Sequence, residues 1–280
     1  NNMDEHWIVI IDTMMNLDMM YEATRLTSDN RYADAATVQA EKAMHTHIRP
    51  DGTTYHVVNV DQKTGKYLQR MTAQGYSDES CWSRGQAWGV YGYAQCALRT
   101  GRQDFLDTSR RLADTFLSLL GPEGVPAWWV CVRRLEPKLM CRDFKAPKPC
   151  PFDASAGIIA ARGMQMLYQL LKSQDPKAAE EYLARANKLV EDILRECLSP
   201  AATLTDGKVD WGKDGWETLL MHSTIAGYEK ATRRFMDHGL VYADYYLIEF
   251  SNEAIKIDAE RAGAKVNGAV LNGVPNGAAH

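Results

Sequence analysis

The sequence predicts an all-α protein, and three features of the chain support this fold class. About seven stretches carry apolar residues at the three- and four-residue spacing of an amphipathic helix. Tight turns alternate with long loops that contain glycine, proline and aromatic residues. No repeat occurs at the periods typical of helical-repeat proteins. The pattern therefore predicts antiparallel helix pairs. Long loops that gather at one end of these pairs indicate a closed helical toroid with a pocket at one mouth.

The boundaries of the expected helices follow from apolar spacing and from turn residues. The first helix follows the apolar run 8–11, with Asp12 as its N-cap, and we expect Met15, Met19 and Ala23 to form its buried face. A Pro-Asp-Gly turn ends the second helix, and a Gly-Pro pair ends the fourth. The predicted ranges are 12–23, 31–47, 82–98, 104–120, 153–171, 176–198 and 241–255.

One pair of short extended segments interrupts the helices. Residues 54–58 and 66–68 flank the Lys-Thr-Gly turn at 63–65, which predicts a β-hairpin on the rim. His56 lies on this hairpin. A histidine in a strand is commonly a packed or hydrogen-bonded residue, and the alternative is a role in a site.

The stretch from Gln74 to Trp88 is the centre of the predicted organisation. Its first half is a polar loop, and Ser80 is the expected N-cap of the helix that follows. Arg84 and Trp88 are four residues apart and share one helix face. A guanidinium fork beside an indole suits a sugar ring that carries a carboxylate. The alternative is an aromatic core position beside a solvated arginine.

Asp12 also has two interpretations. The simpler one is the N-cap already described. In the other, the surrounding isoleucines and methionines remove water from the carboxylate and raise its pKa. A carboxyl group of this kind suits a residue that gives a proton and takes one back.

Composition narrows the possible functions and locations. The 280 residues are 45% hydrophobic and 24% charged, enough for one large core or two modest ones. A net charge of -4 without a basic run argues against nucleic acid as a partner. The apolar runs are too short to span a membrane, and no signal-peptide pattern is visible at the start of the chain. We therefore expect a cytoplasmic protein without a membrane partner.

The six cysteines form no Cys-x-x-Cys pair, so a zinc site is not expected. They are instead expected to be mostly buried free thiols of a protein from a reducing compartment.

Five segments resemble unsaturated glucuronyl hydrolases, the glycoside hydrolases that include unsaturated chondroitin disaccharide hydrolases. They occur in the order of that family, between Ile8 and about Phe250. The segments are 10–17, 49–58, 74–88, 152–156, and 220–222 together with 242–246. The resemblance implies an (α/α)6 barrel of six helix pairs. The implied substrates are oligosaccharides that polysaccharide lyases leave with a 4,5-unsaturated uronic acid at the non-reducing end.

The resemblance also implies roles for individual residues. The family hydrates the enol-ether double bond with one aspartate as acid and base, and this aspartate matches Asp12. His56 and Gln74 match positions near the reacting ring, while Arg84 and Trp88 match positions that hold and stack the uronate. This chemistry requires no metal and no cofactor, and the sequence shows no ligand cluster for a metal.

The leaving sugar is expected to meet the segment 223–238, where the family varies, and His222 directly before it. Candidate contacts are His222, Lys230 and Arg233. The basic residues either bind sulfate or carboxylate groups or form a solvated face.

Two departures from the family affect the expected extent of the fold. An aspartate that the family carries upstream of its acid/base residue has no counterpart here. We therefore expect a single domain, 1–280, that forms an incomplete barrel without its first helices and is N-terminally truncated. Residues 130–142 have neither a helical nor a strand period, which suggests a translated intron or an added loop, and residues 258–280 are expected to be a tail.

Three functions stay open at this level. The first is hydrolysis of glycosaminoglycan-like lyase products. The second is the sister activity on unsaturated rhamnogalacturonan disaccharides from pectin. The third is a non-catalytic sugar-binding remnant or helical scaffold. The oligomeric state is not predicted.

Overall fold

The structure is a computed structural model that describes residues 5–120, 124, 129–130, 151–228 and 230–263. Its framework is helical, which confirms the predicted all-α class. The described residues form seven α-helices: α1 (Leu17–Thr27), α2 (Arg31–His47), α3 (Ser83–Thr100), α4 (Gln103–Ser118), α5 (Ala154–Leu171), α6 (Pro176–Cys197) and α7 (Val241–Arg261).

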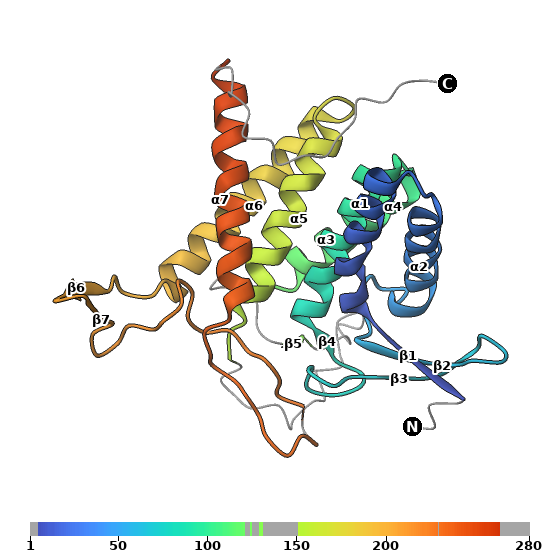
Figure 1. The fold of residues 1–280 in the computed structure, drawn as a ribbon, viewed down its shortest axis with the longest axis horizontal. Helices are drawn as coiled ribbons and strands as arrows, with labels where there is room; N and C mark the ends of the chain where they lie inside the picture. Colours follow the sequence, from blue (N-terminus) through green and yellow to red (C-terminus); the bar gives the residue numbers. More distant parts are fainter. Residues whose placement is uncertain (1–4, 121–123, 125–128, 131–150, 229, 264–280) are drawn as a thin grey trace, which may run out of the picture.

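These helices form the antiparallel pairs that the sequence predicts. Helix α1 packs against α2, α3 against α4, and α5 against α6, while α7 packs on α5. The helices α1, α3, α5 and α7 begin at one end of the molecule, and α2, α4 and α6 run in the opposite direction (Figure 1). The strands and the longer loops gather at the end where α1, α3, α5 and α7 begin (Figure 1).

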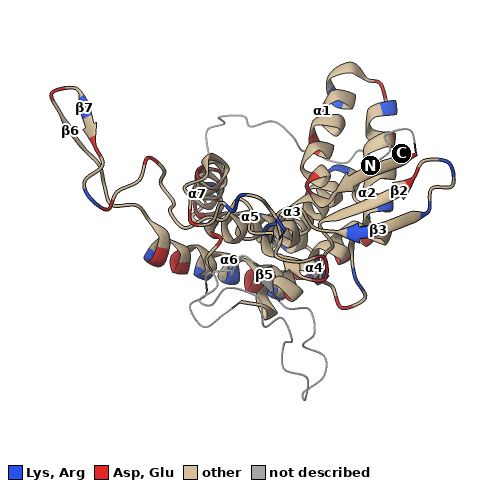
Figure 2. Ribbon diagram, turned by 90° about the horizontal axis from the view of Figure 1, so that it is seen from below, with Lys and Arg blue, Asp and Glu red and all other residues tan. Residues whose placement is uncertain are grey.

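The core lies between α3 and α5, which are buried on nearly all sides. Small residues let the two helices approach closely. A Cβ at Gly163 of α5 would lie 3.0 Å from the backbone of Tyr91 in α3, so a larger residue would push the helices apart. The outer helices α4 and α6 have one apolar and one charged face, and acidic and basic residues are interspersed along α6 (Figure 2).

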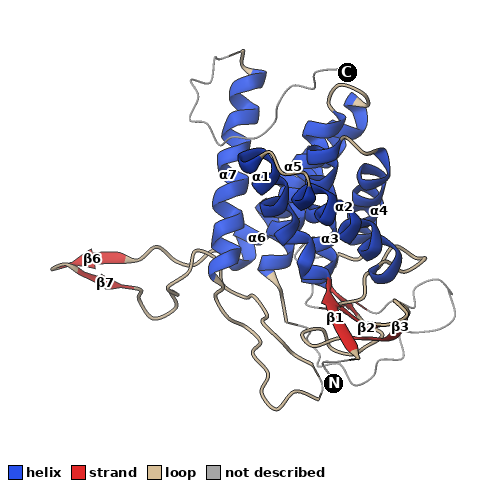
Figure 3. Ribbon diagram, turned by 45° about the vertical axis from the view of Figure 1, so that its right-hand side comes forward, coloured by secondary structure: helices blue, strands red, loops and turns tan. Residues whose placement is uncertain are grey.

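A small antiparallel sheet covers part of the loop end. Its strands are β1 (His6–Ile10), β2 (Val57–Asp61) and β3 (Tyr67–Met71), with β2 in the middle. The hairpin of β2 and β3 confirms the sequence prediction, whereas β1 was expected only as an apolar run. Two further pairs are β4 (Cys81–Trp82) with β5 (Trp129–Val130), and β6 (Thr203–Thr205) with β7 (Lys208–Asp210). The β6–β7 hairpin, which the sequence did not predict, projects away from the helices (Figure 3).

The first predicted helix differs from the structure at its start. Residues Ile11–Asn16 form a 3-10 helix, η1, and the α-helix begins only at Leu17. Asp12 is therefore not an N-cap, because Ile10 occupies that position and Asp12 lies within the first turn. The N-cap interpretation of Asp12 is wrong.

The buried face of this segment is also shifted. Its buried residues are three apart at first, because a 3-10 helix has three residues per turn, and four apart once the α-helix begins: Ile11, Met14, Leu17 and Tyr21. Met15 and Ala23 are only half-buried, and Met19 is 70% exposed. The predicted face of Met15, Met19 and Ala23 is therefore wrong.

Ser80 does not cap α3 either. The helix begins at Ser83 after Trp82, whose extended backbone occupies the N-cap position. The Ser80 hydroxyl instead donates to the Ser77 carbonyl and accepts from the Ser77 amide, which closes the preceding loop.

Other predictions concern the ends of segments and the cysteines. Helix α7 continues past the predicted end at Ile255 to Arg261. Residues 131–142 of the expected insertion and 264–280 of the expected tail lie outside the described residues. The thiols of Cys81, Cys96 and Cys197 are buried and free, as predicted. The other three cysteines lie outside the described residues. Within the described ranges, no helix is both long and apolar enough to cross a membrane.

Candidate functional site

The five predicted site residues converge at the loop end of the helices. Asp12 lies in η1, His56 directly precedes β2, and Gln74 lies in the loop between β3 and β4. Arg84 and Trp88 lie in the first two turns of α3. Contacts among these side chains connect segments that are far apart in the sequence, so the grouping is a property of the fold.

The side chains of Asp12 and His56 face each other. The Oδ2 atom of Asp12 lies 3.7 Å from Nε2 of His56, and the backbone amide of Ile11 donates to the His56 carbonyl at 3.0 Å. Asp12 keeps 27% of its side chain exposed, yet its Oδ2 is buried and has no hydrogen-bond partner. Burial raises the pKa of Asp12, and its backbone hydrogen bond and the charge of Arg84 oppose this shift. The nearby indole N–H of Trp88, which makes no hydrogen bond to a described residue, opposes it less. The sequence-based expectation of a raised pKa is confirmed in direction.

His56 is buried and neutral. Burial lowers the pKa of His56 to about 3, and the nearby charge of Arg84 adds to the shift. Its Nδ1 atom accepts from the backbone amides of Ala73 and Gln74 at 3.2 and 3.3 Å. The same residue is therefore well packed and also part of the candidate site, so the two interpretations from the sequence are compatible.

Arg84 is not a solvated arginine. Its side chain is almost fully buried, and Nη1 donates to Asp153 at 2.9 Å and to the Thr224 carbonyl at 2.6 Å. Nη2 donates to Oε1 of Gln74 at 2.8 Å and to the Ile225 carbonyl at 3.0 Å. The guanidinium thus joins four separate segments, and the predicted grip on a substrate carboxylate stays a prediction.

Aromatic rings surround this charged centre. The Trp82 ring lies 4.3 Å from the His56 ring and 4.6 Å from the Arg84 guanidinium. Tyr242 of α7 lies 5.4 Å from the same guanidinium. Trp88 is only 8% exposed and packs edge-on against Tyr246, with ring centroids 5.6 Å apart. The stacking of Trp88 on a sugar ring stays a prediction.

Three members of this cluster were not predicted as site residues. They are Trp82, Asp153 and Tyr242, which occur in the segments that resemble the family but received no role there. For Asp153, the available signal was an aspartate directly before a helix rich in small and apolar residues. Its buried contact with Arg84 depends on how α5 packs against α3, and no local pattern shows this.

The segment 222–238 folds as a narrow loop beside the cluster. Bridges between Ser223 and His238 and between Ala226 and Phe235 pair its two sides. Its base is bound to Arg84 through the carbonyls of residues 224 and 225. Lys230 and Arg233 are exposed, and His222 at the base bonds through Nδ1 to Asp237 at 2.6 Å. The base of the loop thus contacts the cluster, whereas Lys230 and Arg233 lie beyond its second bridge. Contact of His222, Lys230 and Arg233 with a leaving sugar stays a prediction.

Helix ends add to the electrostatics of the site. Helices α3, α5 and α7 begin at the loop end where the cluster lies (Figure 1). The amide groups in the first turn of a helix carry partial positive charge, which favours an anionic ligand. In the part of the chain that the structure describes, no group of three or more His, Cys, Asp and Glu residues could hold a metal ion.

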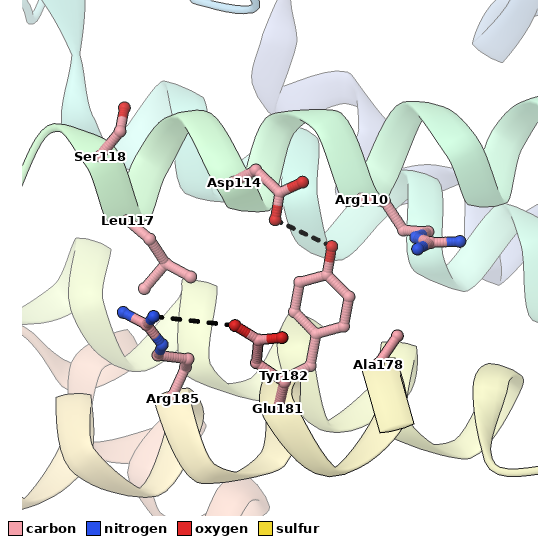
Figure 4. A pocket seen from close by; sticks show the side chains of 8 residues that line it. All are labelled: Arg110, Asp114, Leu117, Ser118, Ala178, Glu181, Tyr182 and Arg185. Atoms are coloured by element: carbon pink, nitrogen blue, oxygen red, sulfur yellow. Dashed lines mark hydrogen bonds and ion pairs between the residues drawn. The ribbon is translucent and has the colours of Figure 1, made fainter. Parts of the chain in front are cut away.

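A separate groove of about 450 Å³ lies between the outer helices α4 and α6. Several of its polar groups are paired with one another: Tyr182 donates to Asp114 at 2.9 Å, and Arg185 lies 3.7 Å from Glu181 (Figure 4). It contains none of the predicted site residues. The groove is therefore not part of the candidate site.

Comparison with known proteins gives the following relatives. No family model matches the chain. An unsaturated glucuronyl hydrolase from Formosa agariphila is 29% identical over 245 residues, which cover 86% of this chain and 53% of that protein. An unsaturated chondroitin disaccharide hydrolase from Streptococcus pyogenes is 29% identical over 250 residues, which cover 88% of this chain and 55% of that protein.

A search of solved structures also finds unsaturated glucuronyl hydrolases. The crystal structure of an unsaturated glucuronyl hydrolase specific for heparin matches with a TM-score of 0.71 and 29% identity, over 90% of this chain and 60% of that one. The chain thus spans just over half the length of the curated relatives that it matches.

Proposed function

We propose that this chain, a relative in sequence and fold of the unsaturated glucuronyl hydrolases, carries a site that hydrates the C4=C5 double bond of 4,5-unsaturated uronic acids at the ends of oligosaccharides. The observation that carries the proposal is the position of Asp12. Its partly exposed carboxyl group has one unpartnered oxygen, lies 3.7 Å from His56, and belongs to the same cluster as Arg84 and Trp88.

Asp12 acts first as an acid and then as a base. Its protonated form gives a proton to C4, and positive charge develops at C5 and the ring oxygen. The resulting carboxylate takes a proton from the water that attacks C5. The hemiketal formed in this way opens by itself and releases the sugar. The raised pKa supports this role because a carboxyl group must hold a proton at working pH in order to donate it.

The surroundings of Asp12 suit an anionic uronate. Arg84 contributes a permanent positive charge, and three helices begin at the same end of the molecule. The indole of Trp88 and the ring of Tyr242 provide apolar walls beside the charged centre. A flat ring that bears one carboxylate matches this combination of charge and aromatic surface.

The leaving sugar lies toward the loop 222–238 in this proposal. Its exposed Lys230 and Arg233 offer two positive charges to a sulfate or carboxylate on that sugar. A neutral rhamnose from pectin gains nothing from these charges. The basic loop therefore favours products of glycosaminoglycan lyases over rhamnogalacturonan disaccharides.

The proposed setting of the reaction is a reducing compartment such as the cytoplasm. The three described cysteines are free thiols in the core, and free buried thiols are typical of proteins from such compartments.

A substrate panel tests the function. The protein is incubated with unsaturated disaccharides derived from chondroitin, heparin, hyaluronan and pectin, and the absorbance of the enol ether is followed. We expect loss of absorbance with at least one glycosaminoglycan product, and none with the Asp12→Asn variant. The control is Asp34→Asn, which changes an exposed aspartate on α2 and should leave the rate unchanged.

The same experiment separates the alternatives. Faster turnover of the pectin product than of all others would assign the sister activity. Binding of a disaccharide by calorimetry with constant absorbance would indicate a non-catalytic sugar-binding protein. Constant absorbance without binding would contradict the proposed function altogether.

A further inference from the structure

Three donors surround one ring nitrogen of His56. The Nδ1 atom lies 3.2 Å from the Thr72 hydroxyl and accepts from the backbone amides of Ala73 at 3.2 Å and Gln74 at 3.3 Å. A backbone N–H can only donate. Nδ1 must therefore present its lone pair to this turn, since a hydrogen on Nδ1 would meet two amide hydrogens.

The position of the ring hydrogen follows from these contacts. A neutral imidazole carries one hydrogen, so it lies on Nε2. Nε2 is the atom that faces Oδ2 of Asp12 at 3.7 Å. This separation is longer than a hydrogen bond, so the Nε2–H faces the Asp12 carboxyl group without bonding to it and can donate to an oxygen that approaches both groups from the side.

The turn that holds Nδ1 is itself fixed by two side chains. Oδ1 of Asp78 accepts from the Thr72 amide at 2.8 Å, and the Thr72 hydroxyl accepts from the Gly75 amide at 2.8 Å. The buried Arg49 donates to the Ser80 carbonyl at 3.1 Å, which anchors the far end of the same loop. The amides at 73 and 74 thus occupy a defined place before any ligand arrives.

We propose that Asp78 and Thr72 are positioning residues: they hold the turn 72–75 so that its amides fix His56 as the Nε2–H tautomer, which presents a neutral donor to Asp12. The charged and titratable groups around His56 are Asp12 of η1, Arg84 of α3 and His47 at the end of α2. A cationic His56 would favour the ionised form of Asp12 and so remove the proton that the reaction needs. A neutral His56 can hydrogen-bond to the Asp12 carboxylate after proton transfer without adding a charge.

The role of this arrangement in catalysis rests on the proposed function. The assignment of the Nε2–H tautomer rests only on the hydrogen bonds to Nδ1. The test is therefore spectroscopic. Long-range ¹H–¹⁵N correlation spectra of the ¹⁵N-histidine-labelled protein distinguish the two neutral tautomers and the cation. The His56 signals are assigned by their loss in His56→Gln. We expect the Nε2–H pattern at neutral pH and no titration of His56 down to about pH 4, because its pKa is lowered to about 3.

The variant Asp78→Ala removes the acceptor that anchors Thr72. We expect His56 to titrate at least about one pH unit higher, because the turn no longer holds its amides against Nδ1. On unsaturated substrate, kcat should fall on the order of 10-fold, since the proton donor Asp12 is still present. The control is Asp61→Ala in the β2–β3 turn, where Asp61 likewise accepts from the amides of Lys63 and Thr64. It should leave the His56 signals unchanged.

The outcomes separate this inference from the proposed function. An Nδ1–H pattern in the wild-type protein, or titration of His56 near its ordinary pKa, overturns the inference whether or not the protein turns over substrate. An unchanged His56 titration in Asp78→Ala overturns the role of Asp78. If Asp78→Ala does not fold, Thr72→Val provides the same test through loss of the hydroxyl at Nδ1. If His56 shows the expected tautomer but the protein turns over no substrate, the inference about His56 stands and only the proposed function is contradicted.

Discussion

Arg84 and Asp153 are 69 residues apart in the sequence and form an ion pair of 2.9 Å in which both side chains are almost completely buried. Ser155 and the carbonyl of Thr224 complete the hydrogen bonds around the pair. Removing one member of a buried pair leaves the other charge uncompensated, which costs far more than losing a surface pair.

We therefore expect Asp153→Asn to lower the free energy of unfolding by roughly 3–5 kcal/mol. Denaturant unfolding followed by circular dichroism measures this change. The control is Asp104→Asn, which removes the exposed partner of Arg102 and should cost at most about 1 kcal/mol. Equal, small losses in the two variants would show that the Arg84–Asp153 pair contributes little.

The variant Arg84→Lys tests whether binding needs the planar guanidinium of Arg84, because it keeps the positive charge. A lysine ammonium can still pair with Asp153, but it cannot also donate to Gln74 and the Ile225 carbonyl as Nη2 of Arg84 does. We expect KM for an unsaturated disaccharide to rise about 10-fold with kcat little changed, since uniform binding is lost. Arg102→Lys on the surface serves as control. A change in kcat alone would contradict the assigned role in binding.

Asp12→Asn should stabilise the protein at neutral pH. The pKa of Asp12 is raised above its ordinary value of 3.8, so the folded chain holds this proton more tightly than the unfolded chain. Folding is therefore penalised as the pH rises from 3.8 through the raised pKa, and the penalty remains above it. Thermal unfolding should give a higher midpoint for Asp12→Asn at pH 7 and no such advantage below about pH 4. A lower midpoint at pH 7 would contradict an unfavourably buried carboxylate.

Trp88→Phe should change the pH dependence of the reaction. The indole N–H of Trp88 makes no hydrogen bond to a described residue, but its position near Asp12 lowers the pKa of that carboxyl group. Loss of the indole N–H should therefore raise that pKa further. Because the reaction starts from protonated Asp12, kcat/KM falls as the pH rises through this pKa. The falling limb should move to higher pH in Trp88→Phe and stay in place in the control Trp211→Phe, a change in a loop beyond β7. Movement to lower pH would contradict the assignment of that limb to Asp12.

Local sequence pattern was sufficient for the regular helices. The range 31–47 is the same in prediction and structure, and the ends of most other helices agree within two residues. The apolar pattern did not predict the segment whose backbone departs from α-helical geometry. The 3-10 turn at Ile11–Asn16 shifted the buried face and took Asp12 out of the N-cap position. The end of α7 at Arg261 was underestimated because most residues of its last turns are charged, although Ile257 among them is buried in the core.

The sequence identified five residues of the candidate site but not the contacts that hold them together. Asp12, His56, Gln74, Arg84 and Trp88 were identified by resemblance to a family, and they do converge. The partners that bury Arg84 come from α5 and from the loop 222–238, so they depend on long-range packing. The turn that holds His56 depends on hydrogen bonds from backbone amides, which carry no side-chain signature.

The central claim is that Asp12 delivers a proton to C4 of an unsaturated uronic acid. Turnover in D₂O tests it most directly, because the exchangeable proton of Asp12 becomes deuterium. The proposed reaction predicts one deuterium at C4 of the released keto acid, on a single face, and no product from Asp12→Asn. Release of the sugar without deuterium at C4, or undiminished turnover by Asp12→Asn, would contradict it.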